Sequence, residues 1–131
     1  MKKINCIYLI MVIAALGCFK PEFNGGVLSY KLTNNTSETL TVEYKKSGQI
    51  ATIYLYPTKT ANFEASQLTN EDGFEEDECQ YCVLLVQKVE REEEGFVSVN
   101  LYEKEIWKYE VSEDRQEATY SLTINDDDLQ E

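Results

Sequence analysis

Hydrophobic and polar residues alternate along most of the chain from Val27 onward, with the two-residue period of β-strands. The run 119–125 shows this most clearly, because Tyr120, Leu122 and Ile124 are each flanked by polar residues. The run 50–56 is hydrophobic on both faces and ends at Pro57. We therefore expect about seven or eight short strands, in the runs 28–32, 40–44, 50–56, 60–64, 82–90, 96–102, 106–111 and 119–125.

Polar turns separate these runs and suggest how the strands connect. The turn 34–37 (NNTS) lies between two alternating runs, so residues 28–44 are predicted to form a β-hairpin. Residues 83–86 contain no polar break, which favours a central strand covered on both faces. Short strands at regular spacing predict an all-β fold. The expected architecture is an antiparallel β-sandwich of immunoglobulin-like or transthyretin-like type, with a β-barrel as the second possibility.

The N-terminal segment has a different pattern. Lys2 and Lys3 precede the run 4–17, which is apolar except for Asn5. This run is shorter than the roughly 20 apolar residues that a helix needs to span a bilayer. A positive start followed by a short apolar run is typical of an export signal, so the segment is predicted to be a signal helix outside the folded domain.

The apolar run ends in the sequence Ala14-Ala15-Leu16-Gly17-Cys18. This stretch resembles the lipobox of small bacterial cell-envelope lipoproteins, in which a small residue directly precedes a cysteine. The order of Ala15 and Leu16 is reversed relative to the commonest form of that motif. The resemblance implies that a diacylglyceryl group is joined to the sulfur of Cys18 through a thioether and that the chain is then cut before Cys18. The lipid would anchor the protein in a membrane. Phe19 follows in place of aspartate, which in that family implies the outer membrane.

The resemblance also divides the chain into three parts. Residues 1–17 are expected to be the lipoprotein signal peptide, and residues 18–26 the lipidated cysteine and a tether. Residues 27–131 are expected to form the β-sandwich domain. Pro21 and the pair Gly25-Gly26 argue against regular structure in the tether.

The charge and composition of the chain restrict the partners and reactions that we expect of it. There are 24 acidic and 12 basic side chains, a net charge of −12, and no histidine. A strongly negative surface repels phosphate backbones, so no nucleic-acid partner is expected. The absence of histidine removes the commonest general base and a common metal ligand. We therefore expect neither an enzyme nor a bound cofactor.

Cys79 and Cys82 are the two cysteines that remain for the folded domain once the N-terminal segment is set aside. A bridge between them requires a turn, because residues three apart in a strand exceed the roughly 7 Å that a disulfide spans between Cα atoms. Without that turn they are free thiols on opposite faces of a strand. A zinc site lacks further ligands, and the preceding acids disfavour redox catalysis. The disulfide and the free thiols both stay open.

Two other groups of residues are candidate sites. The acidic loop 70–78 offers Asp72, Glu75 and Asp77 as calcium ligands, although the spacing of an EF-hand is absent and a solvated loop is the alternative. Five aromatic residues are candidates for a sugar-binding platform, with ordinary packing in the core as the alternative. They are Tyr54, Tyr56, Tyr102, Trp107 and Tyr109.

Together these observations predict a non-enzymatic binding or structural module, held at the cell envelope by lipid on Cys18. Its partners would be the membrane and a surface protein or glycan. A calcium-dependent module using the loop 70–78 is one alternative. A small envelope enzyme or redox protein is the other.

Overall fold

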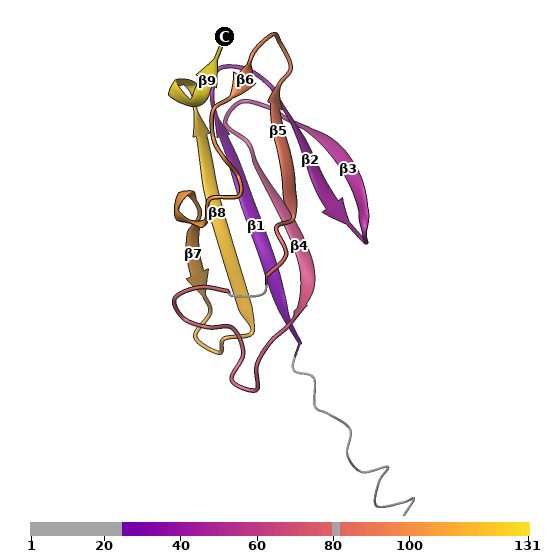
Figure 1. Ribbon diagram of the computed structural model, residues 1–131, viewed down its shortest axis with the longest axis vertical. Coiled ribbons are helices and arrows are strands. Elements are labelled where there is room, and N and C mark those ends of the chain that lie inside the picture. The colour runs from indigo at the N-terminus through magenta and orange to yellow at the C-terminus, as the bar shows by residue number, and fades with distance from the viewer. Residues whose placement is uncertain (1–24, 80–81) are drawn as a thin grey trace, which may run out of the picture.

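The computed structural model describes residues 25–79 and 82–131, and these fold as an all-β sandwich (Figure 1). Its strands are β1 (Gly25–Asn35), β2 (Leu40–Lys46), β3 (Gln49–Leu55), β4 (Thr60–Leu68), β5 (Val86–Arg91), β6 (Phe96–Val97), β7 (Lys108–Val111), β8 (Glu117–Asn125) and β9 (Leu129–Gln130). The described residues also contain two short 3₁₀ turns, η1 (Lys104–Ile106) and η2 (Asp126–Asp128). Within these residues, no helix is long and apolar enough to cross a lipid bilayer.

The strands form two packed sheets and a small third one. One sheet has the order β4-β1-β8-β7, the second has the order β3-β2-β5, and β6 pairs with β9. Most neighbours are antiparallel, but β1 and β8 run parallel, with Tyr30 opposite Tyr120. The expected all-β sandwich is confirmed, and the expectation of a wholly antiparallel arrangement is corrected at this central pair.

The predicted hairpin over residues 28–44 is wrong. Strand β1 pairs with β4 and β8, whereas β2 pairs with β3 and β5 in the opposite sheet. The turn 34–37 therefore carries the chain from one layer to the other.

The fully buried side chain of Asn34 explains this crossing. Its amide nitrogen donates to the carbonyl oxygens of Glu38 (2.8 Å) and Leu55 (2.7 Å). Its side-chain oxygen accepts from the backbone N–H (2.9 Å) and hydroxyl (2.7 Å) of Thr36. Buried polar groups need such partners, and here they fix the connection between the layers.

The core lies between the two larger sheets and follows the alternation in the sequence. The residues expected to face inward on β8, Tyr120, Leu122 and Ile124, are all buried. Aromatic rings fill the half of the core near β7: Tyr30 stacks on Tyr120, and Trp107 meets the Tyr30 ring edge-on. The other buried hydrophobic residues on β1, β2 and β8 are Leu28, Leu32, Leu40, Val42 and Ala118.

Several expected strand bounds need correction. Residues 82–85 are not in a strand, and Val83 is 49% exposed, so the expected covered central strand is instead the edge strand β5. A register shift between Glu43 and Tyr44, opposite Val86, ends the regular pairing there. Strand β6 stops at Val97 instead of reaching Tyr102, and the end of the expected strand lies in a turn in which the N–H of Glu103 bonds the Asn100 carbonyl (3.0 Å).

At the N-terminal end, β1 begins at Gly25, so Gly25 and Gly26 belong to the sheet and not to an irregular tether. Gly26 is buried because the side chain of Phe74 packs against it, and an added Cβ would meet the Phe74 ring. The rest of the expected tether and the expected signal peptide lie outside the described residues.

Candidate functional site

The clearest candidate for a binding surface is the free edge of the β3-β2-β5 sheet. Strands β2 and β3 form a hairpin closed by Ser47 and Gly48, which both have positive φ (51° and 78°). Two consecutive residues with positive φ are what a type I′ hairpin turn requires. Pairing then runs without interruption from Lys46↔Gln49 to Leu40↔Leu55. The far side of β3 has no neighbouring strand among the described residues.

Strand β3 presents large side chains to solvent on its outer face. Ile50 and Tyr54 are 56% and 61% exposed, and Thr52 between them is exposed as well. These three residues are called the edge patch below. On the inner face Ile53 is only half-buried, although its partner Val42 on β2 is fully buried. Figure 1 shows the reason, because β3 lies at the right-hand border of the sandwich, beyond β4.

The side chains of β3 differ from those of the other edge strands. Strand β3 (QIATIYL) contains no charged residue, no proline and no glycine. Strands β4, β5 and β7, which border the two larger sheets elsewhere in residues 25–79 and 82–131, all carry charges. Folded proteins commonly use charges, prolines or bulges to prevent other chains from pairing with an edge. The edge of β3 lacks these protections.

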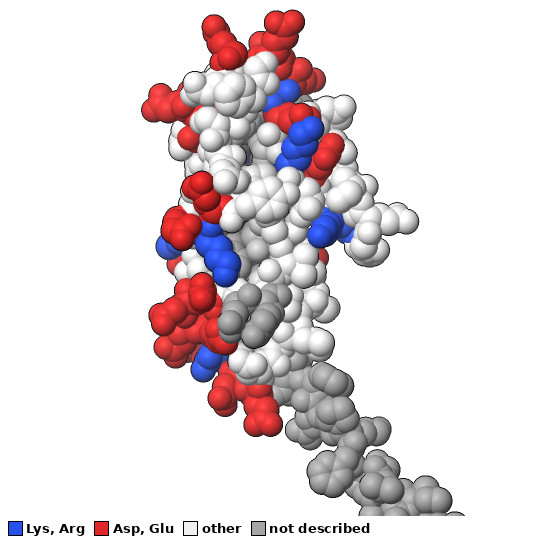
Figure 2. Space-filling view, viewed as in Figure 1, with Lys and Arg blue, Asp and Glu red and all other residues white. Residues whose placement is uncertain are grey.

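The charge around the β3 edge is also unlike the rest of the chain. Residues 39–63 contain one acid, Glu43, and three lysines, Lys45, Lys46 and Lys59, in a chain of net charge −12. Figure 2 shows acidic side chains over both ends and the left side of the molecule, and few along the right-hand border. The edge patch is therefore an apolar surface in the least acidic region.

Ion pairs on the outer face of the same sheet lie further from this edge. On β5 the ammonium of Lys88 contacts the carboxylate of Glu90, and this hydrogen bond raises the pKa of Lys88. Arg91, at the end of β5, pairs with Glu38 and donates to the carbonyl oxygen of Gln130 (2.8 Å). The hydrogen bond to Glu38 likewise raises the pKa of Arg91. The pair of Lys88 and Glu90 is exposed, whereas the half-buried pair of Arg91 and Glu38 joins the end of β5 to the turn before β2.

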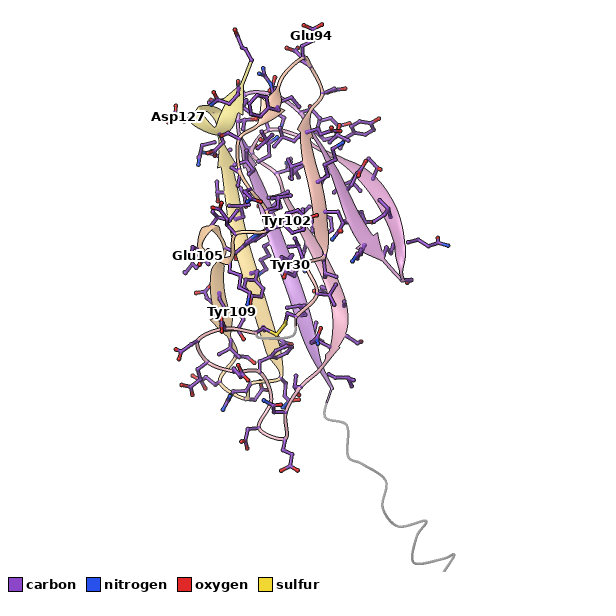
Figure 3. All side chains as sticks on the ribbon, viewed as in Figure 1. Tyr30, Glu94, Tyr102, Glu105, Tyr109 and Asp127 are labelled. Atoms are coloured by element: carbon purple, nitrogen blue, oxygen red, sulfur yellow. A yellow bond between two sulfur atoms is a disulfide. The ribbon has the colours of Figure 1, made fainter. Side chains whose placement is uncertain are left out.

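The five aromatic residues proposed as a sugar platform do not come together. Tyr54 lies on β3 and Tyr56 directly follows it, whereas Tyr109 lies on β7 at the opposite side of the molecule (Figure 3). Trp107 is buried, and its indole N–H donates to the carbonyl oxygen of Leu101 (3.0 Å). Trp107 and Tyr109 therefore pack in or against the core, as the alternative to a sugar platform expects.

Tyr109 has a structural role. Its hydroxyl donates to the backbone oxygen of Glu75 (2.7 Å), and its ring lies 4.8 Å from that of Tyr120. Burial, followed by the nearby Tyr120 and Glu75, raises the pKa of Tyr109 to about 12. Burial also raises the pKa of Tyr30, with Tyr120 adding to the effect.

Tyr102 borders a small pocket near the disulfide. The pocket has a volume of about 110 Å³, and Tyr30, Leu101, Trp107 and Lys104 also line it. The ammonium of Lys104 lies 3.5 Å from a carboxylate oxygen of Glu78. A pocket of this size accommodates one small apolar group at most.

The structure joins Cys79 and Cys82 by a disulfide, with 5.4 Å between their Cα atoms. The backbone N–H of Cys79 also donates to the hydroxyl of Tyr120 (3.2 Å). The bridge closes a local turn, and the hydrogen bond from Cys79 to Tyr120 joins that turn to the aromatic core at β8. Cys18, the expected lipidation site, lies outside the described residues.

The structure does not gather the candidate calcium ligands Asp72, Glu75 and Asp77 into a metal site. Among residues 25–79 and 82–131, no three His, Cys, Asp or Glu side chains are arranged to hold a metal ion. Phe74 holds the loop instead: it is buried, its N–H bonds the Arg115 carbonyl (2.8 Å), and its own carbonyl accepts from the Arg115 guanidinium (2.6 Å). Phe74 and Arg115 therefore hold the loop against the sheet, and the calcium alternative stays a prediction.

Sequence reasoning did not single out the β3 edge, although one signal was visible. The run 50–56 was the one predicted strand whose hydrophobic residues occupy both faces and end at a proline, with no charge. That pattern suits a buried strand as well as an unprotected edge, so the sheet order was needed to decide.

Comparison of the chain with protein-family models, curated proteins and solved structures finds no match.

Proposed function

We propose that this chain is a lipid-anchored, non-enzymatic binding module of a bacterial cell envelope, with the β3 edge as its binding surface. Lipid on Cys18 would hold it at the membrane, and the absence of aspartate at position 19 favours the outer membrane. The observation that carries the proposal is the uncharged edge strand β3, which exposes Ile50 and Tyr54 beside unpaired backbone. Such an edge accepts a further strand through backbone hydrogen bonds, while exposed side chains select the partner.

The composition supports a binding role over a catalytic one. The chain lacks histidine, so the Ser-His and Cys-His nucleophile pairs are not available to it. Both described cysteines are in the disulfide. Strand addition, in contrast, needs only backbone groups and a few apolar contacts, which β3 offers.

The anchor is tested by growing cells that express the full chain with a fatty-acid analogue. The wild-type chain and a Cys6→Ser control should incorporate the label, and Cys18→Ser should lose it. Label retained in Cys18→Ser would contradict the anchor.

The binding surface is tested by placing a photoreactive amino acid at position 54 or, as a control, at position 102. Both tyrosines are well exposed, at 61% and 72%, but Tyr102 lies away from the β3 edge. Irradiation of intact cells should give a covalent adduct from position 54 and none from position 102. Equal yields from the two positions, or no adduct from position 54, would remove β3 as the binding surface.

A further inference from the structure

The edge strand β3 is nearly symmetrical about its middle residue. Thr52 is the fourth of the seven residues Gln49–Leu55, and Ile50 and Tyr54 lie two positions to either side of it. All three side chains lie on the outer face, because alternate residues of a strand point the same way. A strand with this arrangement can pair with a second copy of itself.

We propose that a second copy of this chain occupies the β3 edge, with the two β3 strands antiparallel and Thr52 on the two-fold axis. This inference rests on the proposed function, because it names the partner of the same edge. In this register Ile50 of one copy lies opposite Tyr54 of the other, and Thr52 lies opposite its counterpart. A β-branched residue opposite an aromatic one, and threonine opposite threonine, are both favourable cross-strand pairs. The two three-stranded sheets then form one continuous sheet of order β5-β2-β3-β3-β2-β5.

The inner face of β3 fits the same arrangement. In the proposed register Ala51 of one copy lies opposite Ile53 of the other, and both residues are half-buried at the border of the sandwich. Pairing covers part of that remaining apolar surface. An isologous contact of this kind closes after two copies, so it gives a dimer and leaves no β3 edge free to extend into a fibre.

Charge favours this edge as the place where two copies meet. Each chain carries a net charge of −12, so two copies repel one another over most approaches. Residues 39–63, which include β3, hold one acid and three lysines. Most acidic side chains in view lie over the two ends and the left side of the molecule (Figure 2). Two copies therefore meet less repulsion through β3 than through those acidic surfaces.

An extended acidic peptide is the competing occupant, since it would suit the nearby lysines. The symmetry about Thr52 favours the second copy, because a peptide of another protein requires no such symmetry. A pair of opposite substitutions at this one position separates the two possibilities.

The experiment expresses two differently tagged full chains in the same cells and measures how much of one copurifies with the other. Wild-type chains should copurify. When both chains carry Thr52→Lys, two ammonium groups lie directly opposite, and copurification should fall about tenfold. Pairing a Thr52→Lys chain with a Thr52→Glu chain should restore it. Ser66→Lys, at an exposed position on the other long edge strand β4, is the matched control and should leave copurification unchanged.

A second measurement reports the register without relying on charge. A Thr52→Cys chain should form a covalent dimer on mild oxidation, visible on a non-reducing gel, because only this register places position 52 beside itself. Ser66→Cys should form none. Thermal unfolding of each variant checks the fold, because position 52 lies opposite Glu43 of β2, which repels a glutamate there and attracts a lysine.

Each outcome decides the question. Wild-type copurification that persists with Thr52→Lys in both chains would overturn the second-copy inference, as would a Lys–Glu pair that stays apart. If the photoreactive residue at position 54 instead captures a different chain, the second copy is excluded and the proposed binding surface stands. If it captures nothing, both fail together.

Discussion

The two long edge strands of this sandwich differ in how they meet solvent. Strand β4 (nine residues) borders one sheet, and strand β3 (seven residues) borders the other. At the centre of β4 the exposed Glu64 presents a carboxylate, whereas β3 has no charge along its length. A buried charge would be costly if another strand covered it, so Glu64 protects β4 against pairing. A single charged side chain can therefore decide whether the unpaired backbone of an edge strand is closed or open to a partner.

The inner face of β4 is also more deeply buried than the inner face of β3. Phe63 of β4 is only 4% exposed, and its ring lies 4.6 Å from that of Tyr44 on β2. Ile53 of β3 is half-buried at the border of the sandwich. Strand β4 is thus covered by β2, while β3 extends past the core. A strand that projects in this way offers both an edge and a face.

The largest expected effect tests this difference in burial. Truncation of a buried Phe to Ala removes many contacts and leaves a cavity, so Phe63→Ala should lower the free energy of unfolding by about 3–5 kcal/mol. Ile53→Ala should cost about 1–2 kcal/mol, below the usual range for a fully buried isoleucine, because part of its side chain is already in water. Urea unfolding followed by tryptophan fluorescence measures both.

The two variants are matched because each removes an inward-facing side chain from the middle of an edge strand. Equal losses would mean that β3 is covered as fully as β4. In that case a partner strand could cover less apolar surface of β3 than the exposure of the edge patch indicates.

The sequence predicted well those parts of the fold in which one face of a strand is buried along its length. Alternation placed Tyr120, Leu122 and Ile124 of β8 inside, and they are buried. It likewise found the inward positions Leu28 and Leu32 of β1. Alternation works here because one face of each of these strands packs on the core while the other is more exposed, so burial follows every second residue.

Alternation does not tell which strands are neighbours, and there the sequence was insufficient. The polar turn 34–37 looked like a hairpin turn, but Asn34 donates to the carbonyl oxygen of Leu55, at the end of β3, and so takes the chain across the core. The apolar run at residues 83–86 looked like a central strand, but regular pairing ends at Val86, where the register shifts. Both features depend on residues distant in the sequence.

The candidate site was predictable only in part. The absence of charge in residues 49–55 can be read directly from the sequence. Whether Ile50 and Tyr54 face solvent depends on the sheet order, because the same residues in a central strand under a second layer would be core. The aromatic residues show the same dependence on the fold. A surface platform and packing in the core were both open for Trp107 and Tyr109, and the structure packs them beside Tyr30 and Tyr120.

The free energy of unfolding should also depend on alkaline pH, because the sheet β4-β1-β8-β7 contains the tyrosines Tyr30 and Tyr109. Burial raises the pKa of Tyr109 to about 12 and raises that of Tyr30, compared with about 10 in an unfolded chain. The unfolded state therefore loses these protons first, and stability is fully present below pH 10 and falls as the pH rises from 10 toward 12. Thermal unfolding at pH 8, 10 and 11 measures the decline.

The control for this prediction is Tyr109→Phe, which removes one of the two titrating groups together with its hydrogen bond to Glu75. The variant should start from a lower stability at pH 8 and lose less between pH 10 and pH 11 than the wild-type chain. Identical slopes for the two proteins would show that Tyr109 does not contribute to the alkaline decline.

We expect the smallest change in stability from Glu64→Ile. This variant also tests most directly why β4 and β3 differ as edges. Glu64 is exposed and accepts one surface hydrogen bond from Asn62 (2.7 Å), so its replacement should change the free energy of unfolding by no more than about 0.5 kcal/mol. The substitution leaves β4 without a charge, as β3 is in the natural chain.

In a Thr52→Lys background, where pairing through β3 is prevented, tagged copies should copurify again through β4. Glu64→Asp in the same background retains the charge and should leave the copies apart. If Glu64→Ile also leaves them apart, the carboxylate is not what closes β4, and the cause lies in its cover by β2 at Phe63.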